Sequence, residues 1–141
     1  MTTTKSPVRL GILAAALLVG ALSAGAAFAV EVKVTLSGAN EVPPVTTSAS
    51  GGGTITVGDD RSVSGSVSTT GVAGTAAHIH EGAAGKNGPV IVPLTKEGDH
   101  YKVPAGAKLT EAQMASFKAG KLYINVHSAA NPSGEIRGQL K

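Results

Sequence analysis

Three histidines are the residues of this sequence best suited to chemistry. His78 and His80 stand two positions apart in AAHIHEG, and His127 ends the segment LYINVH. Alternate residues of a β-strand project to the same face, so the side chains of His78 and His80 would start about 6.6 Å apart. Imidazole nitrogens bind a metal ion at about 2.0–2.1 Å, and two rings at that spacing can reach one ion. The pattern indicates a metal site, with His127 on a neighbouring strand as the third ligand.

Other interpretations of these histidines remain open from spacing alone. Solvent-facing histidines on a strand that bind nothing would give the same pattern. His100, in the expected hairpin KEGDHYKV, is a reserve fourth ligand, because only folding could bring that hairpin close. Copper is the expected ion, since imidazole suits it and it ranks highest in divalent affinity, with zinc or nickel as alternatives. No cysteine and no Gly-x-Ser-x-Gly motif is present, so no nucleophile for hydrolytic chemistry is visible.

The first 29 residues have the pattern of a secretory signal peptide. Lys5 and Arg9 precede an apolar stretch over 10–21, and Ala27-Phe28-Ala29 fits the small-x-small cleavage pattern. We expect a mature chain that begins at Val30 and forms one domain over 30–141, exported to the periplasm or the extracellular space. An uncleaved membrane anchor is the alternative. After cleavage no membrane association is expected.

The charge pattern limits the expected partners, and the lack of cysteine limits the sources of stability. The chain has a formal charge of +3, which falls to about +1 when Lys5 and Arg9 are removed. No run of basic residues interleaved with aromatics occurs, so nucleic acid is not an expected partner. Without cysteine no disulfide can form, and stability must come from the core.

The remaining sequence predicts short strands joined by tight turns. EVKVTLSG alternates apolar and polar residues, as a strand with one buried face does, and the turn at 58–61 joins two further strands. We expect seven or eight strands. One helix is expected over 110–119, because Thr110 and Gln113 form a capping box and Gly120 follows as a C-terminal cap. The chain should close with a hairpin whose turn lies at 131–134.

Side-chain alternation assigns faces to these last strands. The expected core face carries Ile79, Ile124, Val126, Ile136 and Leu140. The opposite face, which we expect to face outward, carries the three histidines together with Tyr123, Asn125, Glu135, Arg137 and Gln139. Arg137 could pair there with a carboxylate or guide an anion. Glu81, one position out of phase, should point away from the ion, and the loop Gly82 to Gly88 should form the rim of the site.

Three segments carry a resemblance to a known family. LSGANEVPPV, AHIHEGAAGKNGPVIVPL and LYINVHSAANPSGEIRGQL, in that order, closely resemble the chordin-type (CHRD) domain. The resemblance implies an immunoglobulin-like β-barrel with limited similarity to copper/zinc superoxide dismutases. HIHE is similar to a copper-binding strand of those enzymes, so His78, His80 and His127 would match copper ligands. The chain lacks their bridging histidine, zinc site and disulfide, which places dismutase activity in doubt.

Together these observations predict an all-β fold: an immunoglobulin-like or dismutase-like sandwich or Greek-key barrel with one short helix. The predicted function is an exported copper-binding protein that uses a surface three-histidine site as a metal buffer or carrier, with another exported protein as a further partner. A metal-free extracellular binding or adhesion module is one alternative, and it requires an exposed apolar patch. A redox enzyme with residual dismutase-like activity is another, and it requires an open coordination position.

Overall fold

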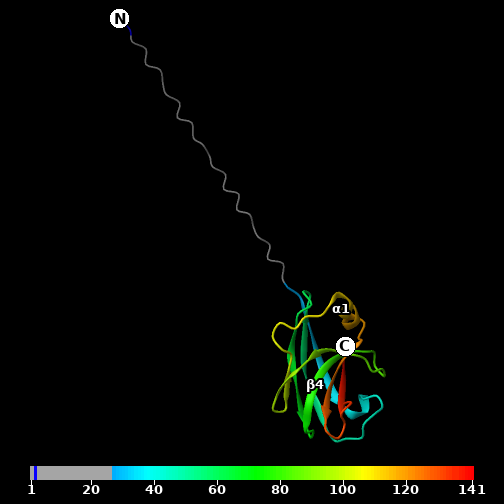
Figure 1. Ribbon diagram of the computed structural model, residues 1–141. Coiled ribbons are helices and arrows are strands. Elements are labelled where there is room, and N and C mark those ends of the chain that lie inside the picture. The colour runs from blue at the N-terminus through cyan, green and yellow to red at the C-terminus, as the bar shows by residue number, and fades with distance from the viewer. Residues whose placement is uncertain (1, 3–26) are drawn as a thin grey trace.

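The computed structural model describes residue 2 and residues 27–141 (Figure 1). The predicted signal peptide, 1–29, lies outside the described residues except for residue 2 and its last three positions, so cleavage before Val30 stays a prediction. Within the part of the chain that is described, no helix is both long and apolar enough to cross a membrane.

The described chain is built almost entirely from antiparallel strands. It forms one more strand than the upper number expected, because the segment after β5 supplies two strands of three residues each. A single α-helix, α1 (Glu111–Lys118), and a short 3-10 helix, η1 (Gly38–Asn40), complete the fold. The strands are β1 (Ala29–Ser37), β2 (Ser50–Gly58), β3 (Val63–Thr70), β4 (Gly74–Glu81), β5 (Val90–Pro93), β6 (Thr95–Glu97), β7 (His100–Lys102), β8 (Leu122–Ser128) and β9 (Ile136–Leu140).

All nine strands belong to one sheet, which curls into a barrel-like body (Figure 1). Their order is β5-β4-β8-β9-β1-β2-β3-β7-β6, so β5 and β6 stand at opposite edges. Only Leu94 separates β5 from β6 along the chain, and its N–H donates to the carbonyl of Ala77 on β4. The two edges must therefore lie side by side, which leaves little unpaired edge. The predicted all-β class with one short helix is confirmed.

The helix α1 forms where the capping signals predicted it. The Thr110 hydroxyl accepts from the Gln113 N–H, and the Gln113 side chain accepts from the Thr110 N–H, which completes the capping box. Gly120 follows the helix with a φ of +71°, a conformation that suits glycine at a helix C-terminus. The helix buries Phe117 against the core and lies across one end of the barrel (Figure 1).

The apolar interior contains every residue that alternation assigned to it. Val32, Val34 and Leu36 from β1 meet the core residues of β4, β8 and β9, which are Ile79, Ile124, Val126, Ile136 and Leu140. The predicted core face is confirmed.

The opposite face of β8 and β9 is not the open surface that we expected. Tyr123, Asn125 and Arg137 are only 2%, 3% and 1% exposed. Two loops cover them: the segment after β1, drawn in cyan in Figure 1, and the segment between β4 and β5. Asn40 Nδ2 donates to the Arg137 carbonyl, and Asn87 Nδ2 donates to the Val42 carbonyl, so the loops are bonded to the sheet and to each other. The sheet therefore has a polar buried layer outside its apolar one.

Candidate metal centre

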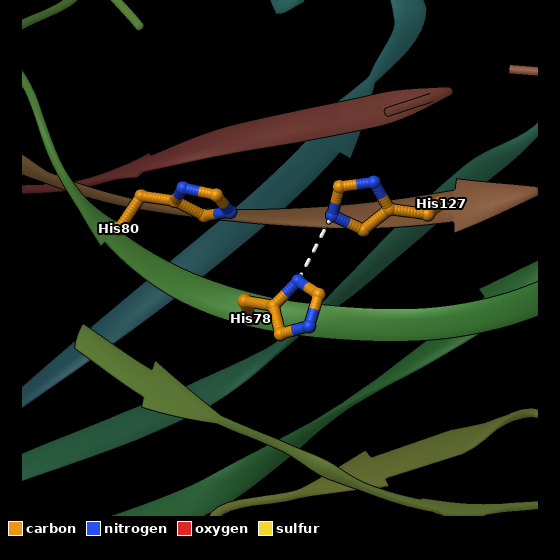
Figure 2. Close-up of side chains that lie close together, drawn as sticks. All are labelled: His78, His80 and His127. Atoms are coloured by element: carbon orange, nitrogen blue, oxygen red, sulfur yellow. Dashed lines mark hydrogen bonds between the residues drawn. The ribbon is translucent and has the colours of Figure 1, made fainter. Parts of the chain in front are cut away.

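Strand pairing brings the three predicted histidines together on this outer face. In the β4–β8 ladder, His80 pairs with Tyr123, His78 with Asn125, and Ala76 with His127. His78 on β4 therefore lies diagonally opposite His127 on β8, with His80 two positions further along β4, and Asn125 lies on the same face directly opposite His78. Figure 2 shows the three rings turned toward a common point.

The distances suit a single ion after a small adjustment. One ring nitrogen from each histidine lies within 4.8 Å of the other two, and His78 Nδ1 is 3.0 Å from His127 Nε2. Two nitrogens bound to one ion at about 2.0–2.1 Å are at most about 4.2 Å apart. The widest pair must therefore close by at least about 0.6 Å, which small side-chain rotations can supply.

Hydrogen bonds fix which nitrogen of two of these rings is free. His80 Nδ1 donates to the Gly88 carbonyl at 2.9 Å, and His127 Nδ1 donates to the Pro132 carbonyl at 2.8 Å. Carbonyl oxygens only accept, so each neutral ring carries its proton on Nδ1 and presents the bare lone pair of Nε2 to the centre. Such outer hydrogen bonds are the usual means by which proteins orient metal-binding histidines.

The loop from Gly82 to Gly88 holds His80 rather than only bordering the site. A side chain at Gly88 would overlap the Glu81 carbonyl oxygen, so only glycine fits where its carbonyl meets the ring. The Gly88 N–H donates to the Tyr123 hydroxyl at 3.0 Å. Tyr123 in turn stacks on the His80 ring, with centroids 4.8 Å apart and planes 6° apart. His80 is thus fixed by a carbonyl at one edge and a ring on one face.

The electrostatics keep two of the imidazoles neutral. Burial lowers the pKa of His78, and the nearby His127 and His80 lower it further. Burial also lowers the pKa of His80, more than its bond to the Gly88 carbonyl raises it, and the nearby His127 lowers the pKa further. Neutral imidazole is the form that binds metal ions, so these rings need not lose a proton near neutral pH before they bind.

The exposure of the site differs from the prediction of a surface patch. His80 is 8% exposed, whereas His78 and His127 are half-buried. The prediction of an open surface site is wrong because the loops that bury Tyr123 and Asn125 also enclose His80. Solvent still reaches the site from the side of the other two rings.

Arg137 does not have the partner expected of it. Its guanidinium carbon lies 3.4 Å from the centroid of the Tyr123 ring, on which it stacks, and its NH2 group donates to the Ala83 carbonyl. Among the described residues it makes no ion pair with a carboxylate, since Lys102 and Glu97 form the one pair found there. Arg137 was expected to be exposed and able to guide an anion. It is instead a buried cation whose guanidinium packs against the ring of Tyr123.

The remaining predicted residues lie apart from the three rings. His100, the reserve ligand, is exposed on β7, and its Nδ1 is 3.0 Å from the Ser68 hydroxyl, so the structure does not bring it into the group. Glu81 accepts from the Ser116 hydroxyl of α1 and so points away from the rings, as predicted.

Sequence analysis missed the two carbonyls that orient the rings. They belong to Gly88, which precedes Pro89 in the loop after β4, and to Pro132, which lies in the turn between β8 and β9. Turn composition signals such loops but does not show which carbonyl faces which ring.

The comparisons with known proteins give one match. A family model described as the CHRD domain matches residues 32–140, from within β1 to the end of β9. No curated protein and no solved structure matches the chain. The similarity of HIHE and INVH to dismutase copper strands therefore stays a prediction.

Proposed function

The chain belongs to the CHRD-domain family, and we propose that this member is an exported protein that binds one copper ion through His78, His80 and His127 and serves as a metal buffer or carrier. Another exported protein that delivers or receives the ion is a further proposed partner. No hydrolytic or redox reaction is part of this proposal.

The observation that carries the proposal is the orientation of the three rings. His80 and His127 each have Nδ1 committed to a backbone carbonyl, which leaves Nε2 free. His127 Nε2 is 3.0 Å from His78 Nδ1, and one nitrogen from each of the three rings lies within 4.8 Å of the other two. His80 Nε2 is buried without any hydrogen-bond partner among the described residues. An unpaired buried lone pair costs free energy, which a bound cation would recover.

The proton between His78 and His127 supports the same conclusion. In the metal-free protein His78 Nδ1 donates to His127 Nε2 over 3.0 Å, because His127 carries its own proton on Nδ1. A metal ion would replace that shared proton and bind both nitrogens. His78 would then hold its proton on Nε2, the nitrogen away from the centre.

Copper is favoured over zinc by the ligand set and by affinity order. All three ligands are imidazoles, which suit copper, and divalent copper exceeds zinc in the affinity series for such sites. The half-buried His78 and His127 leave a route by which the ion can enter and leave, which a buffer or carrier requires.

Copper titration of the purified exported protein tests the proposal. We expect one ion per chain for the wild type and for the control His100→Ala, whose ring is outside the group. Each of His78→Ala, His80→Ala and His127→Ala should lose most of the affinity, and copper should displace zinc. Equal affinity in all four variants would refute the proposal.

The metal-free alternative has less support. It needs an exposed apolar patch, and in residues 27–141 the exposed large apolar residues are Phe28 (76%), Val30 (54%) and Val90. Phe28 belongs to the segment that we expect to be removed, so a patch around it would shrink in the mature protein. Copper binding is therefore the function that the site supports best.

A further inference from the structure

Three buried side-chain atoms in the described part of the chain have no hydrogen-bond partner. They are His80 Nε2, Asn125 Oδ1 and Glu41 Oε1. Asn125 is central among them, because it pairs with His78 across the β4–β8 ladder and precedes His127 by two positions on the same face of β8. Buried polar groups are nearly always paired, so the two unpaired acceptors on the face of the histidines, His80 Nε2 and Asn125 Oδ1, indicate a missing component.

Two neighbours fix the orientation of the Asn125 amide. Its Nδ2 donates to the Ser133 carbonyl at 3.3 Å, which only the nitrogen can do. The same nitrogen lies beside Glu41: a side chain at Gly134 would contact both Asn125 Nδ2 and Glu41 Oε1, the latter at 2.5 Å. Gly134 also has a φ of +130°, which other residues rarely adopt. With Nδ2 committed to this side, Oδ1 is the end left for the histidines.

Asn125 Oδ1 and His80 Nε2 are both hydrogen-bond acceptors, and neither has a donor. His80 carries its proton on Nδ1, toward Gly88, so its Nε2 can only accept. Asn125 lies on the same face of the β4–β8 ladder as this ring, directly opposite His78 and diagonally opposite His80. Two acceptors buried together are unfavourable unless a cation lies between them.

We propose that the amide oxygen of Asn125 is a fourth ligand of the ion bound by the three histidines, with Glu41 and Ser133 as the residues that hold the amide in position. This inference rests on the proposed function and adds to it. The site then has three nitrogens and one oxygen. A carbonyl oxygen is a hard ligand that stabilises divalent copper and contributes little to Cu(I), so the site is selective for Cu(II).

The experiment compares the wild type with Asn125→Leu and Asn125→Ala. Leucine has a similar volume but offers no ligand atom, and alanine removes the amide without adding an apolar branch. We expect Asn125→Leu to lose roughly 10–100-fold in Cu(II) affinity, by the scale of support-residue losses at metal sites. Its Cu(I) affinity, measured under anaerobic conditions, should stay unchanged. The electron paramagnetic resonance spectrum of bound Cu(II) should also change, and Asn125→Ala should show the same loss and the same spectral change.

The outcomes separate this inference from the proposed function. Wild type that binds no copper would overturn both. If the wild type binds copper and Asn125→Leu has the same Cu(II) affinity and spectrum as the wild type, only the assignment of Asn125 as a ligand is overturned. If Asn125→Leu unfolds, shown by a lower melting temperature and loss of Cu(I) binding, Asn125→Ala decides: weaker Cu(II) binding with unchanged Cu(I) binding supports the oxygen ligand, and unchanged Cu(II) affinity and spectrum overturn it.

Discussion

Shortening Ile124 to alanine tests the assignment of faces on which the site depends. Ile124 is fully buried and pairs with Ile79 on β4 and with Gly138 on β9. The change removes three buried carbons, which costs about 2.4 kcal/mol at about 0.8 kcal/mol for each. A cavity adds to this loss when the surroundings cannot collapse.

The surroundings of Ile124 leave little room for collapse. The space beside Gly138 is already filled by the side chains of Val34 and Leu36, both fixed in the central strand β1. We therefore expect Ile124→Ala to lower the free energy of unfolding by about 3–4 kcal/mol.

Denaturant unfolding measures this loss from the shift of the midpoint at constant slope. The matched control is Val30→Ala on β1, because Val30 is an exposed branched residue of a strand. That control should stay within about 0.5 kcal/mol of the wild type. A loss below about 1 kcal/mol for Ile124→Ala, far under the usual range for buried residues, would refute the face assignment.

Three further predictions concern the site and its surroundings. Gly88→Ala should weaken copper binding roughly tenfold, because a side chain there would displace the carbonyl that orients His80. The control Ala84→Ser, at an exposed position of the same loop, should not, and equal losses in titration would contradict this. Burial and the neighbouring rings lower the pKa values of His78 and His80, so bound copper should persist in pH titrations until below 6.5; half-release above 6.5 would contradict this. The Ser128 hydroxyl lowers the pKa of Glu135, which should stabilise the fold above pH 4.5 and lose that contribution as pH falls through the lowered value. Glu135→Gln should flatten this part of the pH profile of unfolding, and an unchanged profile would count against it.

The faces of the histidine strands follow from local sequence. Alternation in AHIHE and LYINVH places isoleucines on one side and histidines on the other, and one buried side fixes the register, since a one-residue slip would expose the core. The helix also follows from local sequence, because its capping box lies within four residues. These features were predictable because each depends on neighbours in the chain.

The burial of the outer face was not predictable in the same way. Arg137, Tyr123 and Asn125 alternate as solvent-facing residues do, and nothing near them in sequence shows that they are covered. The covering loops come from positions 38–49 and 82–89, which only tertiary folding brings to β8 and β9. The closure of the sheet at Leu94 depends on tertiary folding for the same reason, and so do the carbonyls that orient two of the rings.

The central claim is that the three free ring nitrogens bind copper, and a crystal structure of the copper-loaded protein tests it most directly. We predict one copper peak about 2.0–2.1 Å from His78 Nδ1, His80 Nε2 and His127 Nε2. The bonds from His80 to Gly88 and from His127 to Pro132 should be kept. A copper ion bound elsewhere, or bound to His80 through Nδ1 with the Gly88 bond broken, would contradict the account.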